Sequence, residues 1–188
     1  AQGWHIHQLA LHLINGLLLY QLGALLAANN RHGRSMAAIA SLLFWLSPAT
    51  PEVSLWIAGR YNVLATLFGL VAIICHVKNK PVLSAIGMAL ALCSKESAMI
   101  LPALLFSVSW WRHHIEQGPA PYFSERIRNL IRELTPSAIV FTAYLAWRWY
   151  LFGDPLSVYP NSHVGIADIG WDWITRLYGC LLYTSPSP

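Results

Sequence analysis

Apolar runs separated by short polar breaks dominate the chain. The first run has 20 residues, and a helix of that length, at about 1.5 Å per residue, matches a hydrocarbon core of about 30 Å. The later runs are shorter than the roughly 17 to 25 residues of a typical span, so each would recruit flanking residues or thin the bilayer. We nevertheless expect all six to be helical, because so many apolar runs in a row have no sensible packing in one small soluble core. They occupy residues 9–28, 36–46, 63–77, 82–93, 98–111 and 137–152.

The pattern predicts an all-α, polytopic transmembrane helix bundle, with a further partial helix starting near Trp171. Composition points the same way: 56% of the residues are hydrophobic and only 11% are charged, against about 25% charged in soluble domains. Nine Trp and eight Tyr suit the interface between hydrocarbon and water. These proportions disfavour a soluble enzyme or a nucleic-acid-binding domain, and we expect membrane lipids, not nucleic acid, as partners.

The basic residues predict which side each break faces. If the first helix runs inward, eight basic residues lie on the cytoplasmic side and four on the outer side, as the positive-inside rule requires. The cytoplasmic set is Arg31, Arg34, Lys78, Lys80, Arg112, Arg126, Arg128 and Arg132, and the outer set is Arg60, Lys95, Arg148 and Arg176. From Ser124 onward, apolar residues at helical spacing alternate with these arginines, which predicts an amphipathic helix on the membrane surface.

The ends of the chain and its cysteines bear on domain organisation. Cys75, Cys93 and Cys180 form an odd set without metal-ligand spacing, so we expect no disulfide framework and no bound metal. The chain starts at Ala1 without an initiator Met, and we expect residues 1–179 to be a fragment of one multi-spanning membrane domain. Residues 180–188 (CLLYTSPSP) resemble a translated sequencing-library adapter, although a native Pro/Ser-rich loop is the alternative.

The first candidate site residues lie on one stripe of the first helix. His5, Gln8, His12 and Asn15 are spaced three and four residues apart, so they share a face that must turn away from lipid. Two interpretations stay open for this stripe. The side chains either hold neighbouring helices together or line a cavity for a substrate.

Charged residues in the predicted outer breaks are the other candidates. Glu52 and Arg60 lie in the proline-containing break at residues 47–61, either as a loop salt bridge or with Arg60 facing an anionic head group. Lys95 and Glu96 fall in a connection too short to reach far into water. Charges kept at such a depth are costly and often functional. The alternatives are a phosphate-facing site and a simple turn.

Three segments, in this order, resemble the bacterial relatives of the transmembrane and tetratricopeptide-repeat O-mannosyltransferases. They are GWHIHQLALHLINGLLLY, LSPATPEVSLWIAGRYNVLATLF and LALCSKESAMILPALL, and the resemblance covers residues 3–112. The positions that match the family pattern are His5, His12, Asn15, Pro48, Glu52, Gly59, Arg60, Lys95, Glu96 and Pro102. The sequence departs from the family at Gln8, Ser47, Thr50 and Asn62, where Asn, two His and an acid are usual.

The resemblance implies a partial glycosyltransferase C-type membrane domain in a bacterial plasma membrane, with its active face away from the cytoplasm. It implies transfer of a mannose-like hexose from a polyprenyl-phosphate donor to a hydroxyl on a protein or glycan acceptor, without a cofactor. The family's catalytic acid precedes the helix that opens this chain, so it would lie upstream of Ala1 and the catalytic residue is unknown. Arg60 and Lys95 would face the donor phosphate.

Non-enzymatic alternatives remain open at this point. A transporter or lipid flippase would also show polar stripes and isolated charges at membrane depth. In a structural membrane subunit, the same charges would serve assembly only.

Overall fold

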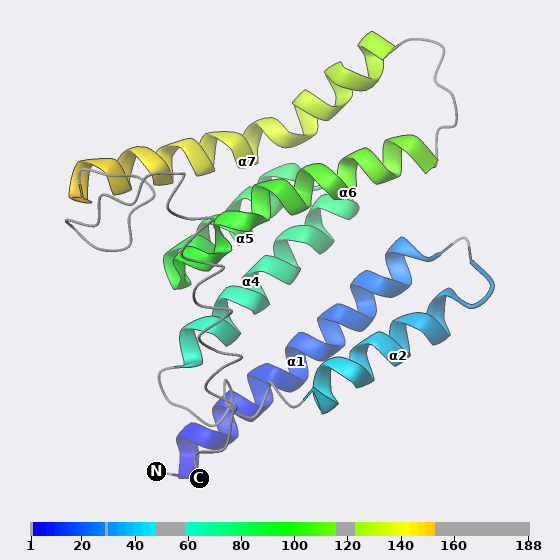
Figure 1. The fold of residues 1–188 in the computed structure, drawn as a ribbon, viewed down its shortest axis with the longest axis vertical. Coiled ribbons are helices and arrows are strands. Elements are labelled where there is room, and N and C mark those ends of the chain that lie inside the picture. The colour runs from blue at the N-terminus through cyan, green and yellow to red at the C-terminus, as the bar shows by residue number, and fades with distance from the viewer. Residues whose placement is uncertain (1, 29, 48–58, 116–122, 153–188) are drawn as a thin grey trace, which may run out of the picture. The chain divides into compact units, whose positions relative to one another are not determined.

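The computed structural model describes residues 2–28, 30–47, 59–115 and 123–152, and every regular element within these ranges is a helix (Figure 1). The expected all-α fold is therefore confirmed for the described part of the chain. The expected partial helix near Trp171, the loop carrying Glu52 and residues 180–188 lie outside it. The elements are α1 (Gln2–Leu26), α2 (Gly33–Leu46), α4 (Arg60–Val77), α5 (Pro81–Ser94), the 3₁₀ helix η2 (Glu96–Ile100), α6 (Leu101–Ile115) and α7 (Phe123–Phe152).

The main departure from the expected elements is α7. We expected a surface helix from Ser124 and a separate span over residues 137–152, but α7 is one continuous helix of 30 residues with Pro136 inside it. A proline removes one backbone hydrogen bond from a helix. In the turn just before it, the Thr135 hydroxyl donates a hydrogen bond to the carbonyl of Ile131 at 2.6 Å. The carbonyl that Pro136 leaves without its helical donor is that of Arg132, so this bond does not replace the lost one, and α7 continues through the proline all the same.

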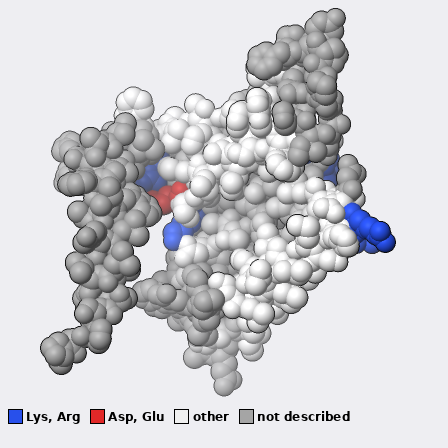
Figure 2. Space-filling model, turned by 45° about the vertical axis from the view of Figure 1, so that its right-hand side comes forward, with Lys and Arg blue, Asp and Glu red and all other residues white. Residues whose placement is uncertain are grey.

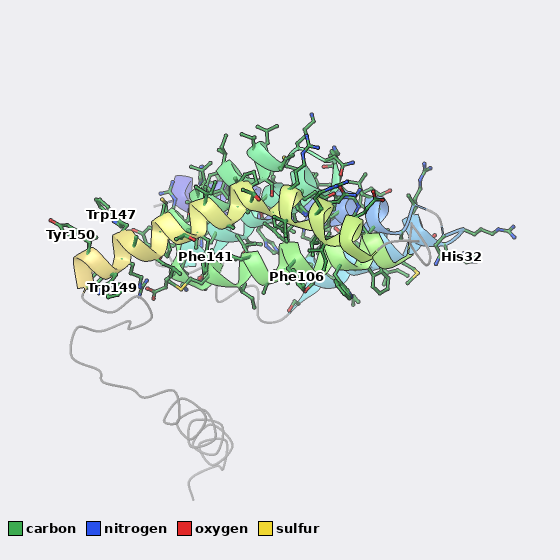
Figure 3. The ribbon with its side chains drawn as sticks, turned by 90° about the horizontal axis from the view of Figure 1, so that it is seen from above. His32, Phe106, Phe141, Trp147, Trp149 and Tyr150 are labelled. Atoms are coloured by element: carbon green, nitrogen blue, oxygen red, sulfur yellow. The ribbon has the colours of Figure 1, made fainter. Side chains whose placement is uncertain are left out.

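The chain divides into two compact units, Ala1–Tyr144 and Leu145–Pro188. In the second unit only the last turns of α7 are described. There, the guanidinium carbon of Arg148 lies 5.7 Å from the ring centre of Phe152, a cation–π distance. Trp147, Trp149 and Tyr150 in the same segment are labelled in Figure 3 and are 63%, 65% and 85% exposed.

In the first unit, α4 packs against both α1 and α5, and α1 packs against α2. Small residues let these helices approach closely. A Cβ added at Gly87 of α5 would lie 3.1 Å from the Cα of Ala72 in α4, and one at Gly23 of α1 would lie 2.9 Å from the Cβ of Ala37 in α2. Close backbone approach at small residues is the usual way that helices pack in lipid, where no hydrophobic effect drives them together.

The turn between α4 and α5 makes the two helices antiparallel. Asn79 adopts the left-handed conformation with φ 57°, and its N–H donates to the carbonyl of His76 at 3.0 Å. The N–H of Lys80 reaches back to the carbonyl of Cys75 at 2.9 Å, which completes a Schellman motif. Pro81 then occupies the first turn of α5, where its missing N–H costs nothing. Asn79 and Pro81 therefore fix where α4 ends and α5 begins.

Two described helical segments, His5–Leu26 and Arg60–Val77, are long and apolar enough to cross a membrane. The apolar helices Gly33–Leu46 and Pro81–Ser94 are shorter. Many large apolar side chains are exposed, among them Leu43 at 65% and Ile6 at 68%. On the face shown in Figure 2, charged atoms occupy only small areas of the described surface. These features are typical of helices that face lipid, whereas a soluble surface of this size would carry more charge.

The close crossing of α4 and α5 predicts a strong response to a larger residue at Gly87. In Gly87→Leu, the new side chain would push against Ala72, which is fully buried. Overpacking of this kind costs about 1 to 3 kcal/mol, so we expect a lower Tm for the detergent-solubilised protein. The matched control is Ile86→Leu, at a neighbouring position that is 51% exposed. Equal melting temperatures for the two variants would contradict the close crossing.

Candidate functional site

The start of α4 meets the junction between α5 and η2. Lys95 is the one extended residue of that junction, with φ −158° and ψ 141°, and its ammonium group donates a hydrogen bond to Oδ1 of Asn62. Arg60 is the first residue of α4 and is half-buried, as Lys95 is, and Glu96 opens η2 with an exposed side chain. Arg60 and Lys95 thus lie at the same end of the pair formed by α4 and α5.

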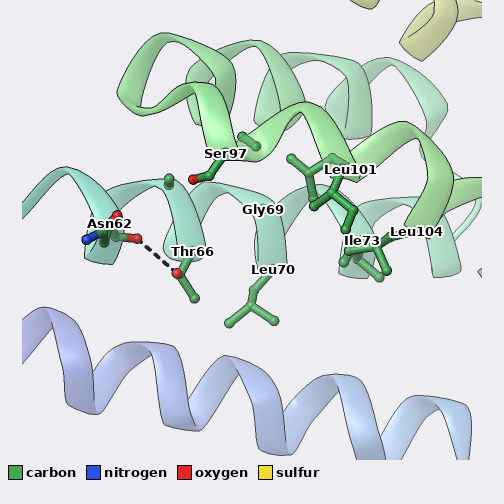
Figure 4. Close-up of a pocket in the computed structure, with 11 residues that line it drawn as sticks. Asn62, Thr66, Gly69, Leu70, Ile73, Ser97, Leu101 and Leu104 are labelled. Carbon is green, nitrogen blue, oxygen red and sulfur yellow. Dashed lines mark hydrogen bonds between the residues drawn. The ribbon is translucent and has the colours of Figure 1, made fainter. Parts of the chain in front are cut away.

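A groove of about 270 Å³ starts at this end and runs along α4 toward α6 (Figure 4). We call it the α4–α6 groove. One end is polar: it carries Asn62, Thr66 and Ser97, and the Thr66 hydroxyl donates to the carbonyl of Asn62 at 2.9 Å. Most of the lining is apolar, and it opens on the surface at Ile100 and Leu104, which are 62% and 40% exposed. The remaining lining residues are Ala65, Gly69, Leu70, Ile73, Ala98 and Leu101.

The polar stripe of α1 is buried, with the exception of His5. Gln8, His12 and Asn15 are at most 7% exposed. His5 is exposed, so our expectation that it shares the buried stripe is wrong. Farther along α1, the side-chain amide of Asn15 donates to the carbonyl of Val63 in α4 at 3.0 Å. None of the four residues lines the α4–α6 groove.

His12 and Asn15 connect α1 to two different helices. The ring of His12 lies 4.8 Å from that of Phe44 in α2, whereas Asn15 bonds to the backbone of α4. Of the two interpretations left open by the sequence, contact between helices describes what these two side chains do. His12 Nε2 and Asn15 Oδ1 are nevertheless buried without a hydrogen-bond partner in the structure.

A buried polar chain links α4, α6 and α7 at the other end of α4. His76 Nε2 and Ser109 Oγ lie 2.5 Å apart, and the Ser109 hydroxyl donates to Glu133 Oε2 at 3.4 Å. With the hydroxyl proton of Ser109 directed to Glu133, the arrangement corresponds to the His76 tautomer that carries its proton on Nε2 and donates it to Ser109. Sequence reasoning missed this set. The sequence feature that could have indicated it is His76 at the end of an apolar run, together with Ser109 and Glu133 in later segments expected to be helical.

The turns that carry basic residues, between α1 and α2 and between α4 and α5, lie at the end of the bundle opposite to Lys95. The guanidinium of Arg112, near the end of α6, donates twice to Oδ1 of Asn79 in the α4–α5 turn, at 3.3 Å. Asn15 contacts Val63, and Leu22 belongs to the same buried cluster as Ala72, so α1 and α4 run in the same direction. The α1–α2 turn with Arg31 therefore belongs to the same end as the α4–α5 turn. This separation agrees with the two sides predicted from the basic residues.

No metal centre is evident in the part of the chain that the structure describes, because no three His, Cys, Asp or Glu residues group together there. Glu52 lies outside the described residues, so its relation to Arg60 stays a prediction. Asn62 is the residue that sequence reasoning did not single out for the site. Its position was noted only as a departure from the resembled family, in which an acid is usual.

Comparison with known proteins gives one informative match. Residues of this chain are 35% identical over 80 positions to "Protein O-mannosyl-transferase F38B6.6" of Caenorhabditis elegans. The match covers 43% of this chain and 11% of that protein, so the chain spans a small part of its relative. No family model matches the chain, and no solved structure matches it. The relative's name agrees with the resemblance seen in the sequence and supports a glycosyltransferase of the mannosyltransferase kind.

The opposite placement of Lys95 and the basic turns predicts how cysteines react in intact cells. We expect a cysteine at Ser97, which is exposed beside Lys95, to react with a membrane-impermeant maleimide from outside. A cysteine at Lys78, exposed at the α4–α5 turn, should react only after the membrane is opened. The background protein would carry alanine at Cys75, Cys93 and Cys180. Labelling of both positions from the same side would contradict the predicted arrangement.

Proposed function

We propose that this chain is part of an integral-membrane glycosyltransferase that takes its sugar from a polyprenyl-phosphate donor. The sugar is a hexose such as mannose, and the acceptor is a hydroxyl group on a protein or glycan at the membrane face away from the cytoplasm. The observation that carries the proposal is the hydrogen bond from the ammonium group of Lys95 to Asn62, which lines the polar end of an apolar, surface-open groove. The similarity to a protein named as an O-mannosyltransferase supports it.

The chemistry explains why a cation is needed. The acceptor oxygen forms a bond to the anomeric carbon of the sugar while the bond from that carbon to the phosphate oxygen breaks. The acceptor proton goes to a general base, and the bonding electron pair leaves with the polyprenyl phosphate. Negative charge therefore grows on the phosphate in the transition state, and a fixed cation nearby stabilises it.

Lys95 is suited to this role by its position. Asn62 is an amide and carries no charge, so the contact between the two orients the ammonium group without neutralising it. Arg60 stands two residues before Asn62 on the same helix, which places a second cation at the same end of α4. In the proposal both cations contact the donor phosphate, and Glu96 and Glu52 help to position them.

The α4–α6 groove is suited to the lipid part of the donor. Leu70, Ile73, Leu101 and Leu104 give it an apolar lining that leads away from the polar end. A volume of about 270 Å³ holds the first isoprene units only, so the rest of the tail would continue into the bilayer. Since the groove opens on the surface, the donor can enter from the lipid side without leaving the membrane.

The general base is not among the residues assigned here. The resemblance implies an Asp or Glu in a segment that precedes α1, and the proposal keeps that assignment. The described residues then supply donor binding and charge stabilisation. In this proposal His12 and Asn15 do not contact the donor. They hold α1 against α2 and α4.

Removal of the charge at Lys95 should abolish sugar transfer. Loss of one group that stabilises developing negative charge typically lowers kcat about 10²- to 10³-fold. We expect this loss for Lys95→Met in the full-length protein that carries this segment, measured as hexose transfer from a polyprenyl-phosphate donor, with partial recovery in Lys95→Arg.

The matched control for this experiment is Lys78→Met, which removes the same charge from an exposed residue at the opposite end of α4. It should retain full activity. Expression level and Tm report whether either variant has lost its fold. Turnover of Lys95→Met equal to that of the unmodified protein would refute the assignment.

Filling the groove should weaken donor binding more than it slows the chemistry. Gly69 lies opposite Leu101, and an added Cβ would already come within 3.2 Å of a Leu101 methyl group. We expect Gly69→Leu to raise KM for a long-tailed donor at least about tenfold with a smaller effect on kcat, since a blocked methyl-sized space costs 1 to 3 kcal/mol.

Two controls separate a blocked groove from a damaged fold. Ala103→Leu adds the same bulk to an exposed position of α6 outside the groove and should leave KM unchanged. A donor analogue with a truncated isoprenoid tail should bind Gly69→Leu and the unmodified protein alike. An equal loss for both donors would show that the groove does not hold the tail.

A further inference from the structure

A second cavity lies at the other end of the bundle, in the turn that joins α1 to α2. It has a volume of about 350 Å³, within the range of small-ligand pockets. Three of its lining residues are alanines and the other three have polar side chains. We call it the arginine pocket, and its lining residues are Ala24, Ala27, Ala28, Asn30, Arg31 and Arg34.

The arginine pocket is lined by two positively charged side chains and by no acidic side chain. No Asp or Glu occurs in the sequence before Glu52. Within the described part of the chain, neither the Arg31 nor the Arg34 side chain takes part in an ion pair or a hydrogen bond. Two guanidinium groups with ten N–H donors between them therefore border one cavity without an anionic partner among the described residues, and phosphate is a group that such planar donors recognise well.

The backbone of the turn adds donors at the same place. Asn30 holds the turn together, because its side chain accepts the N–H of His32 at 3.0 Å and its carbonyl accepts the N–H of Gly33 at 2.9 Å. No side chain caps α2, whose first turn begins at Gly33. The N–H groups of Arg34 and Ser35 in that turn have no acceptor among the described residues. Free N–H groups at the start of a 14-residue helix favour an anion.

The position of the pocket suits a ligand at the membrane surface. Its alanines belong to the last turn of α1 and the residues just after it, where a segment long enough to span a bilayer ends. His32 marks this end in Figure 3, where side chains tipped with nitrogen extend around it. The phosphate layer of a bilayer lies at the depth at which a spanning helix ends.

We propose that the arginine pocket binds a phosphate group, with Arg31 and Arg34 as its charged ligands and the first turn of α2 as its backbone ligand. The pocket is independent of the proposed sugar transfer, because it lies at the end of the bundle opposite to Lys95. The phosphate comes from an anionic phospholipid or from free phosphate in solution, and these two sources have the same recognition chemistry.

The test is native mass spectrometry of the purified chain in detergent, with phosphatidylglycerol, phosphatidylcholine, glycerol phosphate and inorganic phosphate as separate probes. We expect saturable binding of at least one anionic probe, and at least a tenfold weaker Kd in the double variant Arg31→Gln, Arg34→Gln, since it loses both charged hydrogen-bond donors of the pocket. Tighter binding of phosphatidylglycerol than of glycerol phosphate assigns the site to a lipid. Binding of glycerol phosphate and inorganic phosphate as tight as that of phosphatidylglycerol assigns it to free phosphate.

Two variants distinguish a built site from general attraction of charge. Lys78→Gln with Lys80→Gln removes two positive charges from the neighbouring α4–α5 turn and should leave the Kd unchanged. Ala28→Leu keeps every charge but fills the cavity at an exposed position, and it should weaken binding. Equal losses in the arginine and lysine double variants, or no saturable binding of any anionic probe, would overturn the proposal.

Discussion

Close contact between α4 and α5 sets the geometry on which the candidate site depends. Gly87 lies tightly against Ala72, with little room for a larger residue, and the Asn79 turn makes the two helices antiparallel. Asn62 lies ten residues before Ala72, and Lys95 lies eight residues after Gly87. Two antiparallel helices in contact at that crossing must therefore bring Asn62 and Lys95 together. The α4–α6 groove begins where they meet, so its polar end is a direct result of this helix pairing.

Burial of polar groups between helices is the second constraint. In a membrane, a chain with so few charges would have to pair its polar groups mostly with one another, because lipid offers them no partner. Asn15 bonds to the backbone of α4, Ser41 of α2 donates to the carbonyl of Gly16 at 2.7 Å, and His76 shares a proton chain with Ser109 and Glu133. Each of these bonds joins two helices. The few polar positions of the sequence thus join neighbouring helices, together with small-residue contacts such as that of Gly87 with Ala72.

Sequence reasoning was most successful where a single local cause acts. The apolar runs predict α1, α2, α4 and α5 because helix length and hydrophobicity are local properties. It was less successful where two elements meet. His5 has the spacing of the buried stripe but is exposed, and Pro136 does not interrupt α7. The partner of Lys95 could not be predicted, since Asn62 is 33 positions away and only the register of α4 on α5 brings it near.

The central claim is that a lipid-linked sugar phosphate lies in the α4–α6 groove with its phosphate at Lys95. The most direct measurement is photocrosslinking in membranes with a polyprenyl-phosphate hexose that carries a photoreactive group in its first isoprene unit, followed by peptide mapping. The account predicts crosslinks to α4 and α6 around Leu70 and Leu104, which unlabelled polyprenyl phosphate suppresses and a nucleotide sugar does not. Crosslinks confined to other helices, or suppression by the nucleotide sugar, would contradict it.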